Sequence, residues 1–251
     1  MSVLDQAGKP APRPVIATIL GDAGMGKTTL AATFPKPVVI RAEDGVQGVP
    51  EDIKPDALPP LKTVDDLWAQ LGALVKEEHD YKTVIVDSVT QLEQMFVQHI
   101  VETDPKKPRS INQALGGYGA GVSAVGALHQ RVRNAASSLV ERGIHVVFIA
   151  HADTVTIEPP DGDPYTRYDL RLNKRSVAPY TDNVDIVAYL RLQTYTTGDG
   201  ERKKAISDGS RVLVTYATPS NISKNRYGIV EDLPVEVGQN PMAPFIPSLN
   251  Q

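Results

Sequence analysis

The sequence predicts an α/β fold: a mainly parallel sheet flanked by helices, with a C-terminal antiparallel extension of the same sheet. Two observations predict this class. Four apolar runs, at 15–20, 38–42, 83–86 and 144–150, have the continuous hydrophobicity of strands buried on both faces. Beyond residue 150 the runs alternate and turn tightly, which is typical of antiparallel strands. The change of pattern therefore predicts one core with two kinds of strand.

The composition restricts the class of protein. The 251 residues are 41% hydrophobic, enough for one well-packed domain, and carry a net charge of −4. Because the net charge is negative, any contact with nucleic acid must come from local basic loops. The absence of cysteine excludes disulfides, cysteine–zinc clusters and a cysteine nucleophile. No apolar run reaches the roughly 18 residues of a membrane span, so we expect a cytoplasmic protein with no membrane partner.

Proline and periodicity set the expected boundaries. One folded domain is expected at 15–238, between a flexible arm at 1–14 and a flexible tail at 239–251, and each flank contains three prolines. Within the domain, Thr63 and Asp66 have the spacing of a capping box, so a helix is expected to begin there.

Periodicity and turn residues also predict the remaining elements. Other helices are expected after residue 26 to about Phe34, at 89–102 and at 122–141, with loops at 45–62 and 103–121. Later strands are expected at 154–158, 166–172, 185–195 and 211–217, with a turn at 198–200.

The segment GDAGMGKT at 21–28 matches G-x-x-x-x-G-K-[ST] at each fixed position. Its glycines allow successive backbone N–H groups to point at phosphate oxygens, and the next helix adds its positive N-terminus. Lys27 would neutralise the β- and γ-phosphates, and the Thr28 hydroxyl would bind Mg²⁺. The motif predicts an ATP site formed by Gly21, Asp22, Ala23, Gly24, Met25, Gly26, Lys27, Thr28 and Thr29.

Asp87 ends the apolar strand TVIVD and is the expected second ligand on the magnesium side. The alternative is that Asp87 caps the following helix. Because a phosphate loop precedes this strand in the chain, the Mg²⁺ site formed by Thr28 and Asp87 is favoured.

Two further polar residues follow strands that end at the phosphate edge of a parallel sheet. Glu43 could polarise a water for attack on the γ-phosphate, with its neighbour Asp44 as a competitor for that role. His151 could sense the γ-phosphate, or could simply cap the end of its strand. Lys224 and Arg226, in KNRYG, could reach the nucleotide of a neighbouring subunit, or could form an ordinary basic turn.

Together these residues resemble the RecA-like ATPases over roughly residues 15–230. VIVDSVT at 84–90 is similar to that family's Walker-B segment, AEDG at 42–45 to its catalytic glutamate segment, and KNRYG at 224–228 to motifs that contact ATP across subunits. The segments at 148–172 and 179–191 look like those of short phage RecA-like ATPases associated with single-strand annealing and recombination. His151 departs from the pattern, because RecA and DnaB-type helicases carry glutamine there, and the loop at 103–121 is unusually rich in glycine.

The resemblance implies two DNA-facing loops, at about 103–121 and 152–175. The basic residues of these loops, with Tyr165 and Tyr168 available for stacking, suit a single strand. Acidic residues at 158, 161 and 163 would oppose DNA at the tip of the second loop. The DNA-binding candidates are Lys106, Lys107, Arg109, Arg167, Arg171, Lys174 and Arg175.

The leading hypothesis is an ATPase of phage recombination that binds single-stranded DNA and promotes annealing or strand exchange in the host cytoplasm. It would assemble with itself head-to-tail as a ring or filament, and a single-strand DNA-binding protein is a further partner implied by the resemblance. Three alternatives remain: a minimal helicase motor, an ATP-switched DNA-binding mediator with little turnover, and a small-molecule kinase.

Overall fold

The computed structural model describes residues 3–197 and 204–250, so the turn expected at 198–200 lies outside the described residues. Within them, ten strands form one sheet in the order β12-β10-β7-β1-β5-β4-β2-β3, with β11 pairing to β7 and β6 to β5. The strands are β1 (Ile16–Gly21), β2 (Pro37–Arg41), β3 (Asp56–Ala57), β4 (Thr83–Asp87), β5 (His145–Ile157), β6 (Tyr165–Leu170), β7 (Ile186–Leu192), β10 (Arg211–Val214), β11 (Lys224–Asn225) and β12 (Leu233–Val235). A separate hairpin joins β8 (Tyr195–Thr197) to β9 (Lys204–Ile206).

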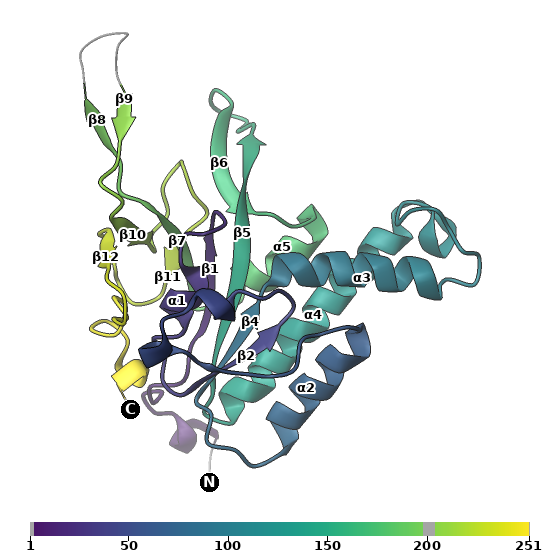
Figure 1. Ribbon diagram of the computed structural model, residues 1–251, viewed down its shortest axis with the longest axis horizontal. Helices are drawn as coiled ribbons and strands as arrows, with labels where there is room; N and C mark the ends of the chain where they lie inside the picture. The colour runs from purple at the N-terminus through teal and green to yellow at the C-terminus, as the bar shows by residue number, and fades with distance from the viewer. Residues whose placement is uncertain (1–2, 198–203, 251) are drawn as a thin grey trace.

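The sheet confirms the expected fold class. Its centre is parallel, from β7 through β1, β5 and β4 to β2, and β10, β11 and β12 extend it antiparallel. Five helices are described: α1 (Lys27–Ala31), α2 (Val64–Lys76), α3 (Val89–Thr103), α4 (Ala120–Glu141) and α5 (Lys174–Thr181). Helices α2 to α5 cover one face, while α1 and the C-terminal segment cover the other (Figure 1).

Alternate residues of the central strands pack into the two layers. In β1, Ile16 and Leu20 contact the apolar cluster under α2 to α5, whereas Ala17 and Ile19 contact the cluster under α1. Both faces of β1 are therefore buried, which is why its sequence is a continuous apolar run.

The strand register brings the polar strand ends to one edge. Gly21 at the end of β1 pairs with His151 of β5, and Asp87 at the end of β4 pairs with Ile149 of β5 and with Arg41 of β2. Strand β5 therefore lies between the strand of the phosphate motif and the strand of Asp87. Residues from four strands converge there.

Side-chain hydrogen bonds cap the first turns of α2 and α3. The Thr63 hydroxyl accepts a hydrogen bond from the Asp66 N–H at 3.2 Å, and the Asp66 carboxylate accepts one from the Thr63 N–H at 2.8 Å. This reciprocal pair is the expected capping box. The Ser88 hydroxyl caps α3 by accepting from the Gln91 N–H at 3.3 Å.

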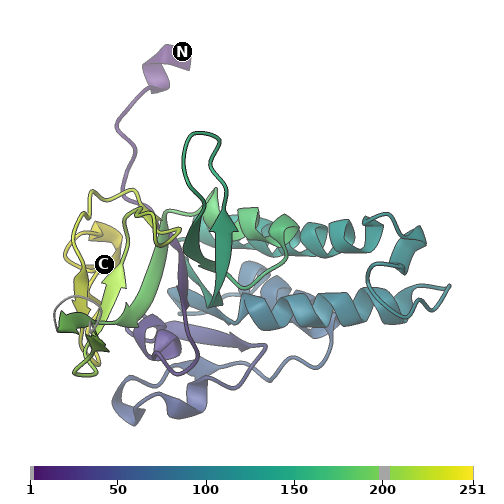
Figure 2. The same cartoon turned by 90° about the horizontal axis from the view of Figure 1, so that it is seen from above.

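Two elements differ from expectation. Strand β5 does not end at residue 150 but continues to Ile157, because Ala152 to Ile157 pair with β6 in a hairpin that extends beyond the sheet (Figure 2). Helix α5 was not expected, because Pro179 lies inside it and its sequence is polar on average. The predicted second DNA loop is therefore a hairpin followed by the start of a helix.

The C-terminal tail is the main correction. Met242, Ile246 and Leu249 are buried against the layer that contains α1, so the expected fraying of the tail at 239–251 is wrong for residues 242–249. Proline content suggested fraying, but the apolar residues between the prolines fill a face of the sheet that α1 is too short to cover. The arm, by contrast, is exposed from residue 3 to 13, extends from the body (Figure 2), and ends in an Arg13–Asp185 ion pair of 2.8 Å.

No helix among the described residues is long and apolar enough to cross a membrane.

The burial of the tail makes a testable prediction about stability. Ile246 is fully buried, so Ile246→Ala should lower the free energy of unfolding by about 2–5 kcal/mol through lost burial and a cavity. Val230 is 79% exposed, so Val230→Ala should change it by less than about 0.5 kcal/mol. Denaturant unfolding of both variants measures the difference. Equal stability of the two would mean that the tail does not pack on the core.

Candidate functional site

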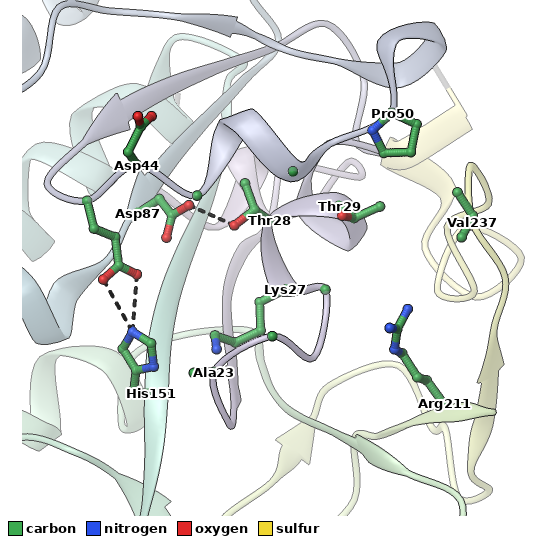
Figure 3. Close-up of a pocket in the computed structure, with 15 residues that line it drawn as sticks. Ala23, Lys27, Thr28, Thr29, Asp44, Pro50, Asp87, His151, Arg211 and Val237 are labelled. Carbon is green, nitrogen blue, oxygen red and sulfur yellow. Dashed lines mark hydrogen bonds and ion pairs between the residues drawn. The ribbon is translucent and has the colours of Figure 1, made fainter. Parts of the chain in front are cut away.

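A cavity of about 600 Å³ opens at the edge where the strand ends converge (Figure 3). It contains most of the phosphate motif together with the carboxylates expected beside it. The lining residues are Ala23, Gly24, Gly26, Lys27, Thr28, Thr29, Glu43, Asp44, Gly45, Gly48, Pro50, Asp87, His151, Arg211 and Val237.

The backbone of the phosphate motif requires its glycines. Gly24 and Gly26 have φ angles of 76° and 88°, in the left-handed region that side chains disfavour. Gly21 lies so close to β7 that a Cβ there would be 2.5 Å from the Leu190 carbonyl oxygen. These glycines let the loop curl tightly between β1 and α1.

Lys27 folds back over the loop. Its Nζ donates to the carbonyl oxygens of Gly21 and Asp22 at 2.9 and 2.8 Å. Burial lowers the pKa of Lys27, while the carboxylates of Glu43, Asp87 and Asp22 act in the opposite direction. The ammonium group is thus held at the cavity by two neutral acceptors that a phosphate could replace.

Thr28 and Asp87 meet directly. The Thr28 hydroxyl donates to Asp87 Oδ2 at 2.7 Å, which joins the first turn of α1 to the end of β4. A Cβ on Gly45 would lie 2.5 Å from Asp87 Oδ2 and 2.7 Å from Thr28 Oγ1. The backbone of Gly45 therefore closes over this oxygen pair, and only glycine fits there.

Asp87 is a buried carboxylate. Burial raises its pKa to about 6, with Glu43 adding to the rise, while the Thr28 hydrogen bond and the charge of Lys27 oppose it. A cation bound beside Asp87 would favour its ionised form. The peptide bond that joins Asp87 to Ser88 is cis.

The oxygen donors fit magnesium. A hydroxyl and a carboxylate are the ligands that Mg²⁺ takes from a protein when phosphate oxygens and water complete its shell. The described residues contain no group of three or more His, Cys, Asp or Glu side chains that could hold a metal by themselves. Thr28 and Asp87 would hold the ion together with the nucleotide, and the ion would neutralise phosphate charge.

Glu43 and His151 form a second pair across the cavity. His151 Nε2 lies 3.1 and 3.3 Å from the two oxygens of Glu43, and this hydrogen bond lowers the pKa of Glu43. The Glu43 N–H donates to the Asp87 carbonyl oxygen at 3.0 Å, which fixes the start of the acidic segment against β4. Asp44, the competitor, lies 3.6 Å from Arg41 and is largely exposed. Glu43 is thus the ionised acid that His151 orients.

Lys224 and Arg226 lie away from this cavity. Strand β11 pairs with the start of β7, at the opposite end of the parallel strands from Gly21. Lys224 Nζ donates to the Asp182 carbonyl oxygen at 2.7 Å, and Arg226 pairs with Asp185 at 3.1 Å. The two basic residues therefore cannot serve the nucleotide cavity of their own chain.

The DNA-binding candidates divide by whether the side chain has a partner within the fold; Arg171 and Arg175 have one although they too are exposed. Lys106, Lys107, Arg109 and Lys174 are exposed. Arg167 pairs with Asp169 at 2.9 Å, and Arg171 donates to the Ala152 carbonyl oxygen at 3.0 Å.

Arg175 connects the two predicted DNA segments. It donates to the Gly119 carbonyl oxygen at 3.1 Å and contacts the Ser123 hydroxyl at the start of α4. Gly126 allows this approach, because a Cβ there would be 2.9 Å from the Arg175 carbonyl oxygen. Its guanidinium is used within the fold.

The sequence did not predict five of the lining residues: Gly45, Gly48, Pro50, Arg211 and Val237. Gly45 stands in the acidic segment, but a lone glycine after two acids gives no sign that it packs on Asp87. Arg211 lies at the start of β10, far along the chain and outside any motif, and its guanidinium is 3.5 Å from the position of a Cβ on Gly26. Only the antiparallel extension of the sheet brings it to the phosphate loop.

Residues 13–227 match the family described as AAA domain. The chain belongs to this AAA domain family. No curated protein matches the chain.

The match covers the phosphate motif, the parallel strands β1, β2, β4, β5 and β7, and the Lys224–Arg226 segment. An AAA domain binds and hydrolyses nucleotide, usually with Mg²⁺, and the cavity contains the residue types that this chemistry needs. The protein is a P-loop ATPase.

The contact of Gly45 with Thr28 and Asp87 gives a specific test. Gly45→Ala should lower kcat/KM for Mg²⁺–ATP by about tenfold or more, because the added methyl group must displace one of the two oxygens. Gly48 lines the same cavity, and no atom lies within 4 Å of the position that a Cβ on Gly48 would take, so Gly48→Ala is the matched control. Steady-state hydrolysis across a Mg²⁺ titration measures both. Wild-type hydrolysis by Gly45→Ala would contradict the assigned role of the oxygen pair.

Proposed function

We propose that this AAA domain ATPase is a phage RecA-like recombination protein that binds single-stranded DNA and promotes annealing or strand exchange. The observation that carries the proposal is the continuity of β5. His151 lines the nucleotide cavity on this strand, and the same strand continues as one arm of the projecting β5–β6 hairpin. A change at the γ-phosphate thus has a direct structural path to an exposed element.

The hairpin has the side chains that a single strand needs. Tyr165 and Tyr168 are each 38% exposed, and base stacking on such rings is tolerant of sequence. Tyr168 also stacks on Tyr189 of β7 with ring centroids 4.8 Å apart, which ties the hairpin to a strand beside the phosphate loop. The ring can contact DNA on one face while the other stays anchored.

The first predicted DNA segment, at 103–121, lies beside the hairpin base. A cavity of about 690 Å³ separates α3 and the 109–111 segment from residues 171–173, and Arg109 and Arg171 both line it. A strand that passes between these segments would meet an arginine from each, and also the carboxylates of Glu93 and Asp153, which line the same cavity. The acidic tip of the hairpin, at 158–163, favours a DNA path near the base rather than over the tip.

Hydrolysis would follow from the cavity residues. Once His151 has left it, Glu43 would accept a proton from the attacking water, while Lys27 would neutralise the phosphate charge that develops. His151 would leave Glu43 for the γ-phosphate in the nucleotide-bound state, and this exchange of partners would move β5.

The position of Lys224 and Arg226 supports assembly with other copies of the chain. They lie at the edge of the sheet opposite the nucleotide cavity, so a head-to-tail neighbour would bring them to the next phosphate site. Arg226 keeps 54% of its side chain exposed despite its ion pair, so it remains accessible to a neighbour.

Two other functions use the same features. A helicase motor would also couple the γ-phosphate to DNA but would need continuous hydrolysis for unwinding. A DNA-binding mediator would need ATP binding and little turnover. A single-strand DNA-binding protein is a further proposed partner, and the site of the protein's action would be the cytoplasm of the host.

The first prediction concerns DNA dependence. Single-stranded DNA should raise the ATPase rate several-fold at a stated salt concentration, because bound DNA would fix the hairpin and release Glu43. Lys27→Ala should abolish hydrolysis with and without DNA. Annealing and unwinding assays on the same protein separate the recombination and motor functions.

The response of the ATPase rate to single-stranded DNA tests the DNA part of the proposal. If ATP is hydrolysed at a rate that single-stranded DNA does not change, the DNA part of the proposal is wrong. Annealing that survives Glu43→Gln but is lost in Lys27→Ala would favour the mediator.

The second prediction concerns the trans-acting pair. Arg226→Ala alone and Lys27→Ala alone should each be inactive, but a mixture should regain hydrolysis, since some interfaces would combine an intact Lys27 with a neighbour's intact Arg226. Arg13 pairs with the same Asp185 oxygen as Arg226 and is equally exposed, so Arg13→Ala is the control that should remain active. If the Arg226→Ala protein hydrolysed ATP by itself, Arg226 would not be needed at the nucleotide site of a neighbour.

A further inference from the structure

Arg211 is a cation without a partner in the described part of the chain. Its guanidinium has no hydrogen bond or ion pair to any described residue, and its Nε is buried without a hydrogen-bond partner. Arg191, on the neighbouring strand, pairs with Asp232 at 2.7 Å. No described acid neutralises its charge, so the guanidinium of Arg211 is available to a ligand of the cavity that it lines.

The guanidinium lies on the phosphate loop. Nη1 and Cζ of Arg211 are 3.5 and 3.8 Å from the position of a Cβ on Gly26. Gly26 immediately precedes the lysine that serves the β- and γ-phosphates, so any nucleotide held by the loop passes beside Arg211. The contact is made within one chain, unlike the one proposed for Arg226.

The cavity has two unlike ends (Figure 3). Asp87 and His151 lie at one end with Lys27, which is where the γ-phosphate would react. Arg211 lies at the other end with Val237, and Pro50 lines the cavity on that side too. Val237 is 63% exposed, so its apolar surface is available to a ligand. A planar cation beside apolar surface suits a purine ring, which has apolar faces and a negative π-surface.

We infer that Arg211 holds the nucleoside end of the bound nucleotide by stacking its guanidinium on the purine. This inference rests on the ATPase activity of the family and not on the proposed action on DNA. Arg211 is then a positioning and specificity residue: it sets nucleotide affinity and fixes the direction in which the triphosphate enters the loop. The chemistry at Glu43 and Asp87 stays the same.

The test separates contact with the base from contact with phosphate. Arg211→Ala should weaken Mg²⁺–ATP and Mg²⁺–ADP by the same factor, about tenfold, and leave inorganic tripolyphosphate unchanged. Arg211→Lys should not restore affinity, because an ammonium lacks the plane that stacks. Titration calorimetry gives the affinities, and kcat at saturating ATP should stay at the wild-type value.

Controls keep a folding defect apart from a binding defect. Arg191→Ala removes a neighbouring arginine that does not line the cavity and should leave all three affinities unchanged. If Arg211→Ala does not fold, Arg211→Met retains the aliphatic length of the side chain and takes its place.

Three results would overturn the inference. If Arg211→Ala lost affinity for tripolyphosphate by the same factor and Arg211→Lys restored it, Arg211 would be a phosphate ligand. A loss of kcat at unchanged affinity would place Arg211 at the reacting phosphate. Unchanged affinity and rate would leave it a surface cation with no role in nucleotide binding.

Discussion

The nucleotide site depends on a carboxylate buried at the end of a buried strand. Asp87 is largely removed from water, which by itself favours its protonated form. Two neighbours favour its ionised form instead: the Thr28 hydroxyl donates to one oxygen, and the charge of Lys27 lowers its pKa. The rest of the cavity is arranged around this requirement: α1 begins where Thr28 can reach Asp87, and the backbone at Gly45 closes over both.

A second carboxylate organises the opposite edge of the same sheet. Asp185 accepts the Ile16 N–H at 2.9 Å, and it pairs with Arg13 and Arg226 through its other oxygen. The parallel strands therefore run between two acidic ends with different tasks. One end holds the residues that would bind nucleotide, and the other holds a cluster of exposed arginines around a buried acid. The two ends of the parallel strands therefore carry different chemical groups. Contact between the unlike ends of two copies would give the proposed head-to-tail assembly.

The sequence was most informative where structure is local. The phosphate motif, the capping box at Thr63 and the four apolar strands each depend on residues within one short window, so spacing alone predicts them. The neighbours Asp87, Glu43 and His151 could be inferred because parallel strands end at a common edge.

What the sequence could not predict depends on contacts between distant segments. Arg211 reaches the cavity only because β10 pairs antiparallel with β7, and the buried tail is apolar at three positions whose partner surface lies elsewhere in the chain. The extension of β5 depends on pairing with β6, and α5 contains a proline that argues against a helix. No short-range pattern carries this information.

The β5–β6 hairpin has a mechanical consequence. Up to His151 the strand is clamped by β1 on one side and, through Ile149, by β4 on the other; beyond it the strand pairs with β6. Beyond Thr154 the hairpin is a short lever, because Tyr168, which pairs with Thr154, is held by stacking on Tyr189. The segment from Val155 to Ile157, at about 3.3 Å per residue, gives it a length of roughly 10 Å. A tilt of about six degrees at the root would move the free end by roughly 1 Å, by the geometry of a lever of that length. Displacements too small to break a hydrogen bond at the root would therefore become movements comparable to an atomic radius at the tip.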